Sequence, residues 1–330
     1  MKIVKERINE FKEDSDPIKD LEIGSFKKIK LWLNSKNISS YTINDDMSID
    51  VIGDVGLREI IPYFIQFGNI KGNFYYGSVD ASTLRGCPFH ITGDFICDNN
   101  NLSSLEFCPN IVGKSFEVYN NKLISLKGCP EIINKNFLCD NNKLQSLKGG
   151  PRLVKGDFSC ASNILSSLEF SPELVNGNFY CTNNKLTSLK GCTSKIGKSF
   201  VCSMNLLTSL QSCPDIGKSL ICSENQLSSL NGVPDNIYET FDCRYNKLVS
   251  LKYGAKMVKM DYLCDNNTLI SLDGCAKYVG RNFSCNNNKL ESLINCPEIV
   301  DGSFFCENNI KKFTINDVTN NCKVIKKIKI

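Results

Sequence analysis

The sequence predicts a mainly β solenoid built from coils of about 21 residues. Three observations lead to this prediction: a phrase of the form FxCxxNxLxxL recurs, its period is nearly constant, and eleven successive copies contain the same asparagine. The centre of the phrase falls at Tyr76, Cys97, Val118, Cys139, Cys160, Cys181, Cys202, Cys222, Cys243, Cys264, Cys285 and Cys306. Ten of the eleven intervals are 21 residues and one is 20. Repeats made of two helices need more than about thirty residues, so one short strand and an extended return fit this period better.

Each coil has a repeating set of apolar positions. Phe95 and Cys97 alternate with an intervening residue, so both are expected to point inward from a strand. Leu102 and Leu105 supply the next inward layer. A proline such as Pro109 fixes an extended backbone on the return side, and Val112 then fills that side of the core. These positions predict one short parallel strand per coil, followed by an extended return.

The asparagine column is the most specific signal in the repeat. It comprises Asn100, Asn121, Asn142, Asn163, Asn184, Asn205, Asn225, Asn246, Asn267, Asn288 and Asn309. A buried amide needs hydrogen bonds, and an inward asparagine at a strand end can bond the backbone of adjacent coils. We therefore expect a stacked, hydrogen-bonded asparagine ladder along one edge of the solenoid.

The segments FICDNNNLSSL, FYCTNNKLTSL and FSCNNNKLESL resemble the LxLxxNxLxxL signature of leucine-rich-repeat proteins. The resemblance covers roughly residues 74–313 and is to the short, cysteine-containing repeats of bacterial and phage type. Two features depart from the bacterial pattern: a single proline replaces a paired arrangement, and cysteine replaces leucine at the strand centre. The resemblance implies a curved parallel sheet that binds another macromolecule.

The two ends of the chain are expected to cap the array, because terminal coils would otherwise expose their cores. Residues 1–72 predict an N-terminal cap with helices over Lys2–Lys12 and Ser25–Ser35, a short hairpin over TINDDMSIDV and a degenerate first coil over Ser48–Pro62. Residues 73–313 predict about 12 coils, and residues 314–330 predict a C-terminal cap strand. Lysines on that strand would prevent edge-to-edge association, and a basic nucleic-acid tail is the alternative.

Composition argues against most enzyme classes. The chain has one histidine, His90, and the sequence contains no HExxH, GxSxG or phosphate-binding glycine loop. We therefore expect no catalytic residue, no cofactor and no metal site. The formal charge of +4 over 330 residues gives no nucleic-acid or membrane signature. The opening MKIVKERINEFKEDSD lacks an apolar signal core and no run could span a bilayer, which predicts a cytoplasmic protein.

The eighteen cysteines fall almost entirely into two columns, with only Cys322 outside them. Cysteine is a small and readily buried residue, so the columns are expected to fill the core with reduced thiols. The same positions also accept Val118, Gly150 and Ser171, which a metal ligand or a nucleophile would not allow. No CxxC pair occurs. A metal or redox role and disulfides between coils are the alternatives.

The residues that alternate with the inward ones are expected on the concave sheet face, where a partner would bind. Eight of the twelve residues one position before the strand centre are apolar, and contiguous exposed apolar area marks interaction surfaces. Acidic residues flank this row, so the face should repel phosphates. The candidate partner-binding residues are Tyr75, Ile96, Leu138, Tyr180, Val201, Ile221, Arg244, Tyr245, Leu263, Phe305, Asp98, Asp140 and Asp265. The alternative is that these side chains pack mainly on each other.

The sequence therefore predicts a non-catalytic protein–protein interaction module that uses its concave face. We expect the chain to be monomeric, with another protein as its partner and no nucleic-acid partner. The alternative is a structural or surface-attachment component of a virion or cell envelope, which would bind through a cap or the convex edge.

Overall fold

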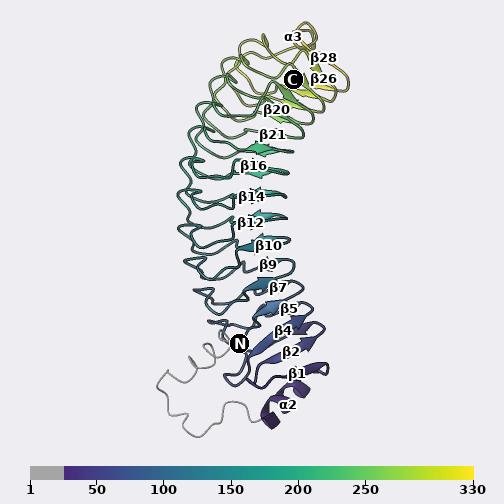
Figure 1. Ribbon diagram of the computed structural model, residues 1–330. Helices are drawn as coiled ribbons and strands as arrows, with labels where there is room; N and C mark the ends of the chain where they lie inside the picture. The colour runs from purple at the N-terminus through teal and green to yellow at the C-terminus, as the bar shows by residue number, and fades with distance from the viewer. Residues whose placement is uncertain (1–25) are drawn as a thin grey trace. The chain divides into compact units, whose positions relative to one another are not determined.

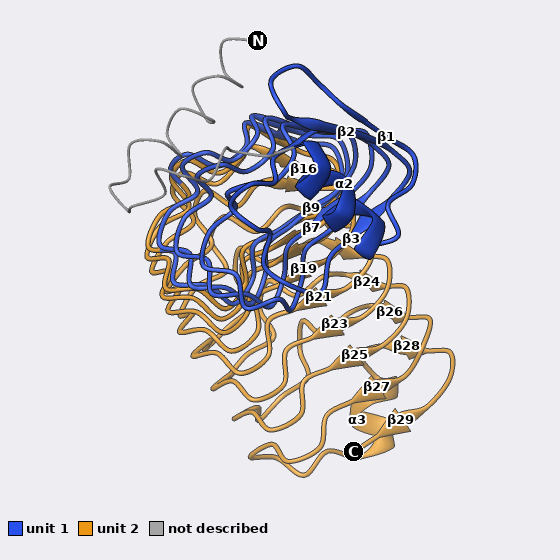
Figure 2. Cartoon of the chain, turned by 90° about the horizontal axis from the view of Figure 1, so that it is seen from below, with its two compact units in different colours: residues 1–144, 148–156 blue, residues 145–147, 157–330 orange. Residues whose placement is uncertain are grey.

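The computed structural model describes residues 26–330, so the helix expected over Lys2–Lys12 lies outside the described residues. The chain divides into two compact units, which Figure 2 colours separately. Unit 1 comprises residues 1–144 and 148–156, and unit 2 comprises residues 145–147 and 157–330. Both units are solenoids of short parallel strands, and successive coils lie beside one another within each unit (Figure 1).

In unit 1, one set of strands, called face strands here, begins each repeat phrase. They pair in parallel in chain order. Their bounds are β3 (Val55–Gly56), β5 (Phe74–Tyr75), β7 (Phe95–Ile96), β9 (Phe116–Glu117) and β11 (Phe137–Leu138). A second set, called return strands here, comprises β4 (Phe67–Lys71), β6 (His90–Ile91), β8 (Ile111–Val112), β10 (Ile132–Ile133) and β12 (Leu153–Val154).

Unit 2 repeats this plan over more coils. Its face strands are β13 (Phe158–Ser159), β15 (Phe179–Tyr180), β17 (Phe200–Val201), β19 (Leu220–Ile221), β21 (Phe241–Asp242), β23 (Tyr262–Leu263), β25 (Phe283–Ser284), β27 (Phe304–Phe305) and β29 (Ile328–Lys329). Its return strands are β14 (Leu174–Val175), β16 (Lys195–Ile196), β18 (Asp215–Ile216), β20 (Asn236–Ile237), β22 (Met257–Val258), β24 (Tyr278–Val279), β26 (Ile299–Val300) and β28 (Lys323–Val324).

The leucine-rich-repeat solenoid predicted from the sequence is confirmed, with one correction to the coil. We expected one strand per coil and an extended return, but the return also forms a two-residue strand. Ile91 pairs with Val112 of the next coil, for example, and both side chains are buried. The return strands form because the close stacking of coils brings extended return segments side by side, where their backbone groups must find partners.

The core of each coil is filled by aromatic rings, leucines and thiols. In unit 1 the rings of Phe95 and Phe116 stack with centroids 5.2 Å apart. In unit 2 Phe179 and Phe200 lie 5.5 Å apart in the same position. The cysteines are present as thiols. Burial raises the pKa of Cys97 and of Cys222 well above the usual range of a thiol, so both stay protonated at neutral pH.

The N-terminal part of unit 1 contains a helix and a hairpin before the first repeat phrase. Helix α2 (Phe26–Ser35) buries Ile29, Trp32 and Leu33. Strands β1 (Tyr41–Ile43) and β2 (Ile49–Ile52) form an antiparallel hairpin. Because β2 also pairs in parallel with β4, the hairpin joins the solenoid directly. The domain boundaries at residues 72 and 313 stay a prediction.

The C-terminal end differs from the single strand expected over residues 314–330. A short helix, α3 (Ile315–Thr319), begins with a capping box in which the Thr314 hydroxyl accepts from the Asp317 backbone and the Asp317 carboxylate accepts from the Thr314 backbone. Strands β28 and β29 then pair with β26 and β27. The last residues therefore complete one more coil, because both faces of the previous coil offer unpaired strand edges.

Among residues 26–330, no helix has the length and apolar character needed to span a bilayer. Within the same part of the chain, no group of three or more histidine, cysteine, aspartate or glutamate residues is placed to hold a metal ion.

Candidate functional site

An inner row of asparagines fixes the spacing of the coils. The row comprises the eleven residues from Asn100 to Asn309 identified in the sequence. In unit 1 the Asn121 side-chain Nδ2 donates to the Cys97 carbonyl at 3.0 Å, and its Oδ1 accepts from the Leu102 amide at 3.0 Å. Asn246 bonds Cys222 and Leu227 in the same way in unit 2. Each amide therefore joins the backbones of two successive coils, which is a structural role.

An outer row of residues immediately precedes the inner row, and the sequence analysis missed it. In unit 1 it contains Asn99, Asn120 and Asn141, all with left-handed backbones at φ between 49° and 53°. Asn120 donates to Asn99 at 2.8 Å and accepts from Asn141 at 2.7 Å. The doubled asparagine in segments such as DNNN and YNNK was the available signal, because asparagine tolerates this conformation better than most residues.

In unit 2 the outer row keeps its left-handed backbone but changes its side chains. It runs through Ser162, Asn183, Met204, Glu224, Tyr245, Asn266, Asn287 and Asn308, with φ between 52° and 56°. Three successive coils thus replace the favoured residue with Met204, Glu224 and Tyr245, all of which are exposed. A side chain such as methionine or tyrosine costs about 1 kcal/mol in this conformation. The conformation of the backbone therefore does not explain why these three residue types occupy the outer row.

The outward residues of the face strands are apolar in the coils of Met204 and Glu224 and in the coil before them. Tyr180 pairs with Val201, and Val201 pairs with Ile221, so the three side chains lie in adjacent strands. All three are half-buried rather than fully exposed, because strands about 4.8 Å apart stack their side chains on one another. Burial, followed by the charge of Asp157, raises the pKa of the Tyr180 hydroxyl.

The apolar surface continues from the strand face onto the adjoining edge. Met204 is 47% exposed and Leu206 is 43% exposed, in the same coil as Val201. The outward residues of successive face strands are called the face row here. Between the face row and the outer row, the buried Ser203 and Ser223 hydroxyls bond each other at 3.0 Å. We define the apolar patch as Tyr180, Val201, Met204, Leu206 and Ile221.

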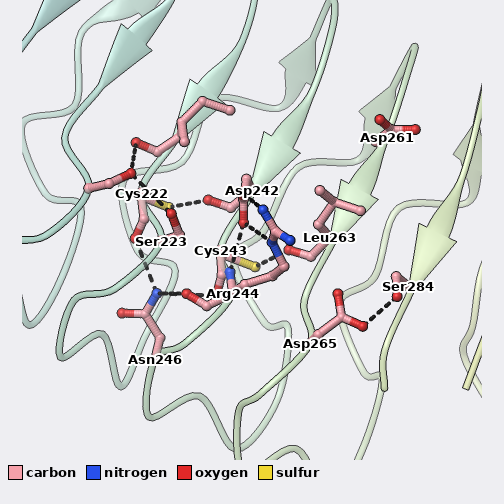
Figure 3. Close-up of polar contacts among 12 residues, drawn as sticks. Cys222, Ser223, Asp242, Cys243, Arg244, Asn246, Asp261, Leu263, Asp265 and Ser284 are labelled. Carbon is pink, nitrogen blue, oxygen red and sulfur yellow. Dashed lines mark hydrogen bonds and ion pairs between the residues drawn. The ribbon is translucent and has the colours of Figure 1, made fainter. Parts of the chain in front are cut away.

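The face row changes character after Ile221, where the next strand carries Asp242. Figure 3 shows the Arg244 guanidinium turned back onto the Asp242 carboxylate, at 2.9 Å from Nε to Oδ1 and 2.7 Å from Nη2 to Oδ2. Hydrogen bonding to Asp242 raises the pKa of Arg244, although burial acts in the opposite direction. Asp242 is only 4% exposed, so Arg244 covers and neutralises it. Tyr245 follows on the edge and is 53% exposed.

A hollow of about 370 Å³ lies beyond Arg244 on the strand face of unit 2. Leu263 and Phe305, both half-buried, contribute apolar walls, and Asp265 and Ser284 contribute polar atoms. Asp261 also borders the hollow and bonds the Arg281 guanidinium. Burial opposes ionisation of Asp261, but the hydrogen bonds from Arg281 and Asn282 outweigh it and lower the pKa of Asp261.

The remaining candidate residues lie in unit 1, so the candidates are divided between the units. Tyr75 and Ile96 pair in adjacent strands, and Glu117 separates Ile96 from Leu138. Tyr75 is 39% exposed, whereas Ile96 and Leu138 are half-buried. Burial, followed by the charges of Asp94 and Asp98, raises the pKa of Glu117. Asp98 and Asp140 occupy the repeat position that Asp265 holds in unit 2, and both are half-buried.

No family model matches the sequence, and no curated protein matches it either. The solved structures that are similar to the chain include three leucine-rich-repeat proteins. YopM from Yersinia enterocolitica WA-314 is 17% identical, with 92% of this chain and 68% of that chain covered and a TM-score of 0.49. YopM, a leucine-rich effector protein from Yersinia pestis, is 17% identical, with 99% of each chain covered and a TM-score of 0.46. The leucine-rich repeat domain of APL1B is 13% identical, with 93% of this chain and 99% of that chain covered and a TM-score of 0.50.

Proposed function

We propose that this chain, which has the leucine-rich-repeat fold, is a non-catalytic module that binds another protein through the apolar patch of unit 2. The observation that carries the proposal is the overlap of two features across four successive coils. The face row is apolar from Tyr180 to Ile221, and the outer row replaces asparagine with Met204, Glu224 and Tyr245 in the coils of Val201, Ile221 and Asp242.

The left-handed backbone of the outer row supports this interpretation. Because Met204 and Tyr245 hold an unfavourable conformation while exposed to solvent, they lower the stability of the free chain without adding to its core. Residues that are poor for folding but contribute large apolar surface are typical of contact positions. A repeat array also offers an extended, preformed surface on which such positions can line up.

The charges of the strand face in unit 2 favour a protein over a nucleic acid. Arg244 is bonded to Asp242, Arg281 to Asp261, and Lys329 lies 3.3 Å from Glu307. These cations are already neutralised by carboxylates, whereas phosphate binding needs cations that are available to the backbone of the nucleic acid. These three cations of the strand face are therefore not available to hold a phosphate chain.

The proposal can be tested with a photo-crosslinking residue placed at Ile221 in the full chain. The matched control carries the same residue at Ile299, a partly exposed isoleucine on return strand β26. We expect a discrete protein adduct from position 221 in host extract and none of the same mass from position 299. Excess unlabelled wild-type chain should compete with the adduct.

The competitor also provides the decisive comparison. A Tyr180→Asp and Ile221→Asp double variant should fail to compete, because charged groups in the patch would oppose apolar contact. Its circular dichroism spectrum should match the wild type, because both side chains point outward from the strands. Identical adducts from positions 221 and 299, or full competition by the double variant, would contradict the proposed function.

A further inference from the structure

We propose that the hollow beyond Arg244 receives a lysine or arginine side chain of the partner protein, with the Asp265 carboxylate as its counter-ion. This inference rests on the proposed function and names the chemistry of the partner beside the apolar patch.

Asp265 differs from the other carboxylates near the hollow. Asp242 is paired with Arg244, Asp261 with Arg281, and Glu307 with Lys329. Asp265 forms no close ion pair among residues 26–330, although only 8% of its surface is exposed, and the one cation whose charge it influences, Arg244, is bonded to Asp242. A carboxylate that is buried to this extent is normally paired with a cation, because the loss of hydration otherwise opposes its charge.

The hydrogen bonds of Asp265 leave one oxygen available. Its Oδ1 accepts from the Ser284 hydroxyl and from the Asn286 backbone amide, the latter at 3.0 Å. No hydrogen bond joins Oδ2 to another group of the described chain. Figure 3 shows that one carboxylate oxygen points toward Ser284 and the other points away from it. The two bonds to Oδ1 fix the carboxylate and orient it before a ligand arrives.

The walls of the hollow suit a long side chain with a charged end. Leu263 and Phe305 provide apolar surface for a methylene stem, and an aromatic ring also attracts a cation. Asn266 and Asn287 border the same hollow and add polar residues to its lining. A volume of about 370 Å³ is large enough for one such side chain.

The position of the hollow relates it to the apolar patch. Along the face row, Ile221 pairs with Asp242 and Asp242 pairs with Leu263. Strands lie about 4.8 Å apart, so the hollow begins roughly 10 Å from Ile221. A single partner segment can therefore place an apolar residue on the patch and a basic residue in the hollow.

The test is selection of a displayed random peptide library on the full chain. Peptides selected on the wild type should combine apolar residues with lysine or arginine at a fixed spacing. Selection on Asp265→Asn should retain the apolar residues and lose the basic enrichment, because the amide keeps the shape of the carboxylate without its charge. The matched control is Asp98→Asn, at the equivalent repeat position of unit 1, which should leave the enrichment unchanged.

Affinity measurements on one selected peptide then isolate the pair. Replacing its basic residue with methionine, or replacing Asp265 with asparagine in the protein, should each weaken binding on the order of tenfold or more, and the two changes together should add little further loss. Equal binding to wild type and Asp265→Asn would overturn this inference. The inference would also be overturned if the selected peptides needed no basic residue and calcium ions displaced them. The carboxylate would then serve as a ligand for a metal ion.

The two proposals fail in different ways. Peptides that lose binding to Ile221→Asp but show no basic enrichment would leave the proposed function standing and overturn the assignment of the hollow. Peptides that bind Ile221→Asp as well as the wild type would contradict the apolar patch, and the assignment of the hollow would be overturned with it. Thermal unfolding of each variant separates these outcomes from loss of folding.

Discussion

The inner and outer asparagine rows lie next to each other in sequence, yet they follow different rules. The inner row contains asparagine in all eleven coils, whereas the outer row accepts Ser162, Met204, Glu224 and Tyr245. Inner side chains such as Asn121 bond only backbone groups, and those groups are buried. Outer side chains such as Asn120 bond neighbouring side chains near the surface.

The difference shows which feature of each row is structural. The inner row requires the amide itself, because one group must both donate to a carbonyl and accept from an amide of the previous coil. The outer row requires a left-handed backbone, which every member retains. The side chain of the outer row can therefore vary, and unit 2 departs from asparagine beside the apolar patch.

The largest expected effect comes from Asn121→Leu in the inner row. The change removes the acceptor for the Leu102 amide and the donor to the Cys97 carbonyl, as well as bonds to Val118 and Tyr119. Each buried group left without a partner costs roughly 1–3 kcal/mol, so the free energy of unfolding should fall by about 3 kcal/mol or more. Chemical denaturation monitored by circular dichroism measures the loss.

A local readout sharpens this prediction. Burial raises the pKa of the Cys97 thiol, and the native chain should resist alkylation there at neutral pH. Opening of the coils around residue 121 would expose Cys97 and speed its modification, as peptide mass spectrometry would show. A variant with wild-type stability and wild-type alkylation at Cys97 would remove the structural distinction between the rows.

A smaller loss is expected from the matched change Asn120→Leu in the outer row. This variant loses the bonds to Asn99 and Asn141, which are near solvent and can be replaced by water. The left-handed backbone at φ 53° adds about 1 kcal/mol of strain for leucine. We expect a loss of about 1–2 kcal/mol in the same denaturation experiment. A loss equal to that of Asn121→Leu would mean that both rows hold the coils together equally.

Sequence reasoning found the inner row and the solenoid because both depend on side chains that must be buried in every coil. It missed the outer row because exposed positions vary, although the doubled asparagines carried the signal. The return strands were missed because two residues show no periodicity, and their pairing depends on the alignment of successive coils. Helix α3 was missed although its capping box was readable in Thr314 and Asp317.

The site was only partly predictable for a related reason. The apolar row from Tyr180 to Ile221 follows from alternation along the strands, but its half-burial depends on side chains of neighbouring coils. The prediction that acidic residues dominate the face did not anticipate Arg281, which bonds Asp261 from a position 20 residues later. The absence of a close ion pair at Asp265, within residues 26–330, appears only after these pairs are identified.

A gain in stability is expected when an asparagine is restored to the outer row of unit 2. Tyr245→Asn replaces an exposed aromatic residue at φ 54° with a residue that tolerates this conformation. The free energy of unfolding should rise by up to about 1 kcal/mol, while the photo-crosslinked adduct from position 221 should become weaker. Unchanged adduct yield would separate Tyr245 from the binding surface. Unchanged stability would show that tyrosine is not strained there.

The smallest effect is expected from Asn183→Gly, which tests whether the outer row needs amides at all. Glycine adopts a left-handed backbone without strain, so it satisfies the conformation at φ 55°. The variant loses one exposed bond, from the Asn183 amide to the Ser162 hydroxyl at 3.2 Å. The free energy of unfolding should therefore change by less than about 0.5 kcal/mol. A loss of about 2 kcal/mol or more would mean that hydrogen bonds between outer-row side chains stabilise the coils. Met204, Glu224 and Tyr245 would then interrupt a structural ladder, instead of occupying positions where the side chain can vary freely.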